Sequence, residues 1–116
     1  MTYPMNIDDK YFRLVDSGVK KHEYRLYDEK RRKIQLNDTI LLKNNSDPSL
    51  TVEAKIIGIN VYKDWHSALK DTYKEDFAGL YHSLDECIKA CSQFYKQEDM
   101  DKYGIVVYSI EKISER

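Results

Sequence analysis

The segment GVKKHEYR, residues 18–25, places several ionisable side chains beside a glycine. An arginine offers a planar fork of donors that matches phosphate or carboxylate, and a lysine offers a movable point charge. Glu23 and Arg25 stand two residues apart, so on a strand they would share a face and pair, which would keep the carboxylate ionised. A carboxylate can also accept from the exocyclic amine of cytosine or adenine. The segment therefore forms either a solvated surface or a site for an anion or a nucleoside.

A second basic run, EKRRK, follows at residues 29–33. Residues 20–33 contain seven lysines and arginines against three acidic residues, a local net charge of about +4. Two interpretations stay open. The run is a solvated turn that keeps a sheet edge soluble, or Arg31 and Arg32 contact phosphates. In the second case, each phosphate of a single-stranded nucleic acid that a basic side chain neutralises adds roughly −0.7 to the slope of log affinity against log salt concentration.

Composition restricts the classes of protein that this chain can belong to. The length of 116 residues predicts a single domain spanning residues 1–116. The formal net charge of −1 argues against a globally basic nucleic-acid binder, so an anion site must be local. No run of about 18 apolar residues and no signal peptide is visible, and we expect no membrane association. The two cysteines lie four residues apart, a spacing that does not suit a disulfide. Two free thiols and no visible export signal together predict a cytoplasmic protein.

Metal and cofactor motifs are missing from the sequence. The three histidines are far apart, and Cys87 and Cys91 fall on the apolar face of an expected helix, where a core role is favoured over metal binding. Neither a phosphate-binding glycine loop nor the spacing of a catalytic triad is present. We therefore expect no metal and no cofactor.

Hydrophobic periodicity and turn residues predict alternating strands and helices. Asn37 is expected at a turn with positive φ, Gly58 at a bulge, and Ser83 at a helix start capped together with Glu86. The expected helices cover residues 6–18, 64–73 and 83–95, and the expected strands cover 23–27, 38–44, 51–62 and 103–113, the last of them central; residues 28–33 form a charged turn or short helix, and 44–49 and 96–102 form loops. The fold class is therefore α+β, with a small barrel favoured over a flat sheet.

The ordered features resemble the ASCH family, whose members have a PUA-like β-barrel with peripheral helices. The pattern Gly18-x-Lys20-x-x-Glu23-x-Arg25 follows a helix and precedes a basic turn. A strand beginning Asp38-Thr39-Ile40 and a closing strand from Tyr103 to Val106 complete the series. The resemblance implies a cleft beside the motif, suited to RNA or a nucleotide-like small molecule. It places Lys20, Glu23 and Arg25 in that cleft and makes Tyr103 the preferred aromatic partner of a base.

Strand alternation and the family pattern disagree about the lysine. Strict alternation puts Lys21 on the face of Glu23 and Arg25, whereas the family pattern selects Lys20, which joins them if it still belongs to the turn. We favour Lys20 and keep Lys21 as the alternative.

An enzymatic role is the second hypothesis. Some proteins of similar fold are amidohydrolases that act on a modified nucleoside, and one is a reported ribonuclease. The former use a lysine with a threonine three residues later, where this chain has Glu23. Glu23 would then act as general base and Lys20 as electrostatic stabiliser. A structural adaptor for a protein partner is a third, weaker hypothesis.

Overall fold

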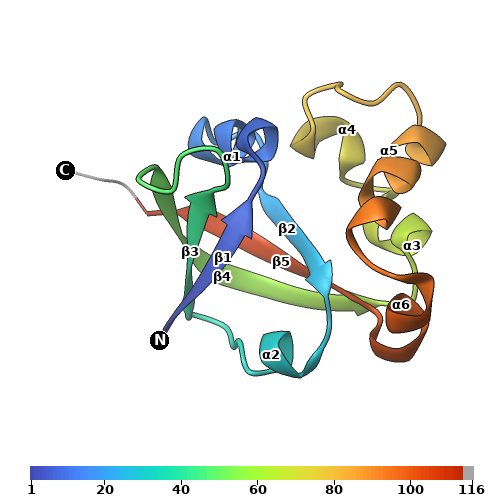
Figure 1. Cartoon of the computed structure of the whole chain (residues 1–116), viewed down its shortest axis with the longest axis horizontal. Coiled ribbons are helices and arrows are strands. Elements are labelled where there is room, and N and C mark those ends of the chain that lie inside the picture. Colours follow the sequence, from blue (N-terminus) through green and yellow to red (C-terminus); the bar gives the residue numbers. More distant parts are fainter. Residues whose placement is uncertain (114–116) are drawn as a thin grey trace.

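The computed structural model describes residues 1–113, which form one curled five-stranded sheet with helices around it (Figure 1). The strands are β1 (Thr2–Ile7), β2 (His22–Leu26), β3 (Thr39–Asn44), β4 (Thr51–Tyr62) and β5 (Ile105–Lys112). The helices are α1 (Asp9–Asp16), α2 (Glu29–Arg32), α3 (Trp65–Leu69), α4 (Tyr73–Asp76), α5 (Leu84–Cys91) and α6 (Gln97–Tyr103), with a short 3-10 turn at Ser92–Phe94. None of the helices within residues 1–113 has both the length and the apolar character needed to cross a membrane.

The sheet has the order β1-β3-β4-β5-β2, so β1 and β2 are its two edges. Only β1 and β3 run parallel; the other neighbours are antiparallel. β4 curls the sheet because its first half pairs with β3 and most of its length with β5, with a bulge between Ile56 and Gly58. A Cβ at Gly58 would lie 3.0 Å from the Ser109 hydroxyl, so a side chain there would crowd β5. The expected bulge at Gly58, the central closing strand and the α+β class are confirmed.

Helix α1 packs on the concave side of the sheet and delivers the motif to its edge. Tyr11, Phe12 and Val15 are buried on one face of the helix. Gly18 ends the turn with φ +83°, and the backbone N–H groups of Val19 and Lys20 both donate to the Leu14 carbonyl. Lys20 therefore stands in the reversal, just before β2 begins.

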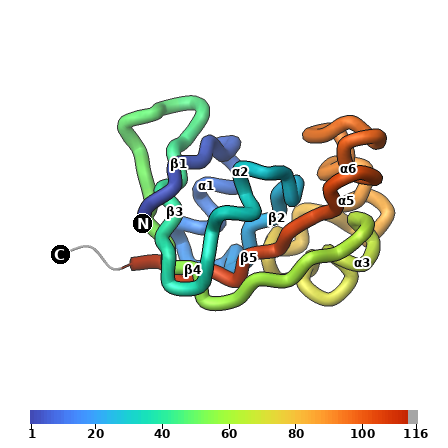
Figure 2. The backbone as a smooth tube through the Cα atoms, turned by 90° about the horizontal axis from the view of Figure 1, so that it is seen from below, coloured from blue at the N-terminus to red at the C-terminus, as the bar shows by residue number. Residues whose placement is uncertain are grey.

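Helices α3 to α6 gather at one end of the sheet. Figures 1 and 2 both show α3, α5 and α6 beside the start of β5, away from the β1–β3 edge. Trp65, Leu69 and Cys87 fill the space between these helices and the strands, and all three are buried. This helical layer forms the second wall of the cavity described below.

Two of the expected elements were wrong. Residues 2–7 form β1, whereas we expected the first helix to begin at residue 6. The parallel pairing of β1 with β3 joins segments about 37 residues apart, which local periodicity does not report. Residues 97–103 form α6 rather than a polar loop, because one buried side chain, Met100, anchors an otherwise polar helix to the core.

The connection from α6 to β5 depends on Gly104. Its φ is +78° with an extended ψ, and an added Cβ would lie 2.9 Å from the Tyr62 carbonyl oxygen. We expect Gly104→Ala to lower the free energy of unfolding by about 1–3 kcal/mol, because this backbone region is almost restricted to glycine and the clash is with rigid backbone. Urea denaturation measures the loss. Gly18→Ala is the matched control: its φ is +83° but the space is open, so it should cost less.

Candidate functional site

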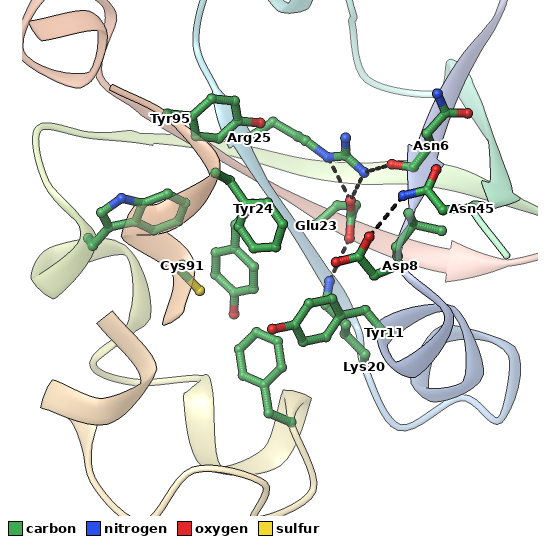
Figure 3. Close-up of a pocket in the computed structure, with 14 residues that line it drawn as sticks. Asn6, Asp8, Tyr11, Lys20, Glu23, Tyr24, Arg25, Asn45, Cys91 and Tyr95 are labelled. Carbon is green, nitrogen blue, oxygen red and sulfur yellow. Dashed lines mark hydrogen bonds and ion pairs between the residues drawn. The ribbon is translucent and has the colours of Figure 1, made fainter. Parts of the chain in front are cut away.

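A cavity of about 220 Å³ lies between the open edges β1 and β2, helix α1 and the helical layer (Figure 3). Its polar part consists of Lys20, Glu23 and Arg25 and of the rim residues Asn6, Asp8 and Asn45, which lie next to them. Its remaining surface is mainly aromatic. The aromatic lining residues are Tyr11, Tyr24, Trp65, Phe77, Phe94 and Tyr95, with Ile7 and Cys91 between them.

Glu23 is the centre of a buried ionic network. Its Oε1 accepts from the Lys20 ammonium at 2.6 Å, and its Oε2 accepts from Arg25 Nε at 2.8 Å and from a terminal Arg25 nitrogen at 2.6 Å. Lys20 is 4% exposed and Glu23 3% exposed. The Lys20 ammonium also donates to the His22 carbonyl. Both carboxylate oxygens are therefore occupied by cations of the same cavity wall.

These contacts set the protonation state of Glu23. Burial favours the neutral acid, but the charges of Lys20 and Arg25 outweigh it and lower the pKa of Glu23 from 4.5 to about 2. Burial likewise opposes the charge of Arg25, and the paired Glu23 carboxylate raises the pKa of the guanidinium. Glu23 and Arg25 are therefore both charged across the physiological range, and the one carboxylate is shared between the two cationic side chains of Lys20 and Arg25.

The strand β2 and the turn before it bring the three side chains together. Glu23 and Arg25 alternate with Tyr24 along β2, opposite Tyr108 and Val106 of β5, and both point to the cavity. Lys20 precedes the strand, so alternation does not apply to it. Lys20 rather than Lys21 meets Glu23 in the structure, which resolves the disagreement between the two sequence-based arguments.

Arg25 also connects the two edges of the sheet. Its terminal nitrogen donates to the Asn6 carbonyl of β1 at 2.8 Å (Figure 3). A side chain thus spans the gap that lies between β1 and β2, and the cavity opens beside this contact.

The aromatic wall is held rigidly by polar contacts behind it. The Tyr24 hydroxyl lies 2.5 Å from the Thr72 hydroxyl and donates to the buried Asp76 carboxylate. Trp65 stacks on Tyr95, with ring centroids 6.3 Å apart and planes 13° apart. The rings of Tyr24, Trp65 and Tyr95 therefore present fixed faces to the cavity, and they have little side-chain entropy left to lose when a flat ligand binds.

The other residues expected at the site lie outside this cavity. Lys21 borders a separate hollow near the end of β5, and its backbone N–H donates to Asp76 at 2.9 Å. Arg31 pairs with Asp28 at 3.0 Å, and Arg32 donates to the Tyr27 carbonyl. Tyr103 ends α6 and is not among the residues that line the cavity.

The rim and the aromatic wall were missed by the sequence analysis. Asn6, Asp8 and Asn45 come from two segments more than 35 residues apart. The aromatic residues come from α1, β2, α3, the end of α4 and the region after α5. The chain has ten tyrosines, but tyrosine suits strands, half-wet clefts and stacking surfaces alike, so composition does not locate this wall. Among residues 1–113 no group of three or more histidine, cysteine or acidic side chains is arranged to hold a metal ion.

Comparison with known proteins assigns the fold to a family. Residues 5–114 match the ASCH domain. The crystal structure of the hypothetical protein PH0355 is similar, with TM-score 0.84 and 35% identity over 97% of this chain and 100% of that chain. The solution structure of protein PF0455 from Pyrococcus furiosus is similar, with TM-score 0.74 and 29% identity over 99% of this chain and 100% of that chain.

A mutant of the ZmASCH protein from Zymomonas mobilis shares the fold at 12% identity, with TM-score 0.58 over 97% of this chain and 74% of that chain. No curated protein matches the sequence. The curled sheet, the motif residues gathered at its open edge and the match over residues 5–114 agree, and the chain belongs to the ASCH domain family.

Proposed function

We propose that this protein binds RNA or a nucleotide-like small molecule by taking one flat ring into the cavity between β1, β2 and the helical layer. The observation that carries the proposal is the enclosure of a cavity of about 220 Å³ by six aromatic side chains with a hydrogen-bonding rim. Aromatic stacking contributes about 1–3 kcal/mol per base in single-stranded nucleic-acid complexes. Sites for drug-sized ligands usually measure about 300–1,000 Å³, so this volume favours one ring system over a longer stretch.

Contacts to phosphates are a separable part of the proposal. Arg31 and Arg32 are the basic residues of α2 expected to make them, and Lys30 next to them is exposed. The guanidinium groups of both arginines already contact Asp28 and the Tyr27 carbonyl. We therefore expect phosphate contacts to add weak, salt-sensitive affinity to a complex whose main interaction is the base.

The protonation state and the contacts of Glu23 favour a binding function over a hydrolytic one. A general base is most efficient when its pKa is near the working pH, whereas the pKa of Glu23 is lowered to about 2 by Lys20 and Arg25 despite its burial. Both of its oxygens also accept from these cations, so a water molecule would have to displace one of them. The same contacts suit a residue that shapes and orders the cavity wall.

Phe94 offers a test that leaves the fold intact, because its ring is 52% exposed while it lines the cavity. We expect Phe94→Ala to weaken binding of single-stranded RNA and of nucleosides by about 1–3 kcal/mol, the usual contribution of a stacking ring. Isothermal titration calorimetry measures the affinities. Trp65, the single tryptophan of the chain, also lines the cavity and reports occupancy by its fluorescence.

Leu36→Ala is the matched control, since Leu36 is 56% exposed and does not line the cavity. Equal effects of the two variants, or wild-type protein whose heat and fluorescence respond to no RNA or nucleoside, would contradict the binding function. Release of acetate from N4-acetylcytidine, lost in Lys20→Ala, would instead establish the hydrolase.

A further inference from the structure

We infer that Asp8 selects the ligand: the cavity takes an uncharged nucleobase that bears an amino group, and the Asp8 carboxylate accepts a hydrogen bond from that group. This inference rests on the proposed function and identifies the class of ligand. Its starting point is the position of Asp8 at the cavity rim, where Figure 3 shows the carboxylate among the polar lining residues.

Asp8 is an N-cap residue that does not cap. It immediately precedes α1 with extended backbone angles, yet its side chain makes no hydrogen bond to the first turn of the helix. An aspartate at this position normally accepts from a backbone N–H two or three residues later. Here Asn45 Nδ2 donates to Asp8 Oδ1 at 2.8 Å, from the loop after β3. The carboxylate is thereby turned from the helix to the rim of the cavity.

The second oxygen of Asp8 is available to a ligand. Within residues 1–113 no side chain or backbone group donates to Oδ2. Glu23, which we had considered for reading an exocyclic amine, has both oxygens occupied by Lys20 and Arg25. The acceptor available to an amino group of the ligand is therefore Asp8, whereas Glu23 fixes the positions of Lys20 and Arg25 in the cavity wall.

The charge of the cavity excludes a phosphate. Lys20 and Arg25 contribute two positive charges and Asp8 and Glu23 two negative charges, so the charged lining residues sum to zero. Lys20 and Arg25 pair with Glu23, whereas the Asp8 carboxylate at the rim forms no ion pair within residues 1–113 and repels an anion. An aromatic cavity without net charge binds an uncharged flat ring, and the phosphates of a nucleotide stay outside it.

The free carboxylate oxygen then discriminates among bases. Guanine, adenine and cytosine carry an exocyclic amine that donates a hydrogen bond, whereas uracil has carbonyl oxygens at the corresponding positions. A uracil carbonyl oxygen in that place would face the Asp8 carboxylate, and no hydrogen bond would form because both groups are acceptors. A site with a charged acceptor therefore favours the amino-bearing bases. A ligand that covers Oδ2 without offering a donor leaves this acceptor unpaired, which is costly.

The experiment is calorimetric titration of the full chain with guanosine, cytidine, adenosine and uridine. We expect the best amino-bearing nucleoside to bind about tenfold more tightly than uridine. Its 5′-monophosphate should bind within about threefold of the nucleoside, with little change between roughly 50 and 200 mM salt, because the phosphate makes no contact in the cavity. Inorganic phosphate should not compete.

Asp8→Asn reverses the hydrogen-bonding character of the rim. Asn45 Nδ2 keeps the amide oxygen facing it, so the new NH2 group takes the place of Oδ2 and donates. We expect about a tenfold loss of affinity for the amino-bearing nucleosides and a gain for uridine. Asp16→Asn, the same charge change at the exposed other end of α1, should leave the ranking unchanged.

The outcomes separate this inference from the proposed function. Equal affinity of wild-type protein for uridine and the amino-bearing nucleosides, the same ranking in Asp8→Asn, or competition by inorganic phosphate would overturn the role of Asp8 and leave nucleoside binding standing. A wild-type protein that binds no nucleoside and no RNA would overturn both.

Discussion

Replacing Glu23 by glutamine is expected to lower the free energy of unfolding by about 3–5 kcal/mol, the usual cost of removing one partner from a buried ion pair. The substitution keeps the shape of the side chain but removes the charge that balances Lys20 and Arg25. The Lys20 ammonium, which belongs to a residue 4% exposed, would then be buried without a counter-charge. Urea denaturation followed by the fluorescence of Trp65 measures the difference at neutral pH.

The same carboxylate makes stability depend on pH in a defined direction. The pKa of Glu23 is lowered in the folded protein from 4.5 to about 2, because Lys20 and Arg25 outweigh its burial. Its contribution is therefore complete above about pH 4.5 and is lost as the pH falls toward 2. The shift corresponds to about 3 kcal/mol. We expect Glu23→Gln to lack this part of the acid destabilisation.

Glu111→Gln is the matched control for both measurements. Glu111 lies on the neighbouring strand β5, is exposed and forms no ion pair among the described residues. Its replacement should change stability by less than about 0.5 kcal/mol and leave the acid profile as in the wild type. A Glu23→Gln variant as stable as Glu111→Gln would show that the network does not hold the cavity wall together.

Replacing Asp76 by asparagine is the second large effect that we expect, a loss of about 2–4 kcal/mol. Asp76 is 2% exposed, and its carboxylate accepts from the Lys21 backbone N–H at 2.9 Å, from His22 Nδ1 at 3.0 Å and from the Tyr24 hydroxyl. An asparagine keeps one acceptor oxygen and turns an NH2 group toward the remaining donors. The contact between β2 and α4 would weaken, and with it the position of the Tyr24 ring in the cavity.

Urea denaturation and nucleoside titration together check the role of Asp76. We expect the variant to lose stability and also to bind more weakly, because Tyr24 is one wall of the cavity. Asp71→Asn, an exposed position five residues earlier, should alter neither quantity. Tyr24→Phe removes a single donor and should cost about 1–2 kcal/mol, less than Asp76→Asn. If the two variants of this pair lost the same stability, the Tyr24 hydroxyl alone would account for the effect.

Local sequence determined most of the scaffold of this protein. The run from Thr51 to Tyr62 showed its bulge through doubled isoleucines before Gly58, and the structure has the bulge there. Ser83 caps α5 by accepting from the Glu86 N–H, as its spacing indicated. Asn37 takes the expected positive φ. These features depend on residues a few positions apart, and such interactions can be read from the chain alone.

The motif of residues 18–25 could also be recognised from neighbouring residues, but the sequence did not show which groups its charged side chains contact. Spacing predicted that Glu23 and Arg25 share a face of β2, and the ordered series of features predicted the family. Whether Lys20 or Lys21 joins them depended on where β2 begins. Whether the positive charges are free to bind an anion depended on their partners, and the tertiary structure commits Lys20 and Arg25 to Glu23.

Only the tertiary structure decided the character of the site. Asp8 and Asn45 meet across 37 positions because β1 pairs in parallel with β3, and the aromatic wall joins β2 to helices that follow it by 40 to 70 residues. Such contacts are selected by burial and by the pairing of distant strands, which leave no periodic mark on either segment alone. The local run of positive charge pointed to an anion, whereas folding pairs Lys20 and Arg25 with Glu23 and leaves a mainly aromatic cavity whose charged lining residues sum to zero.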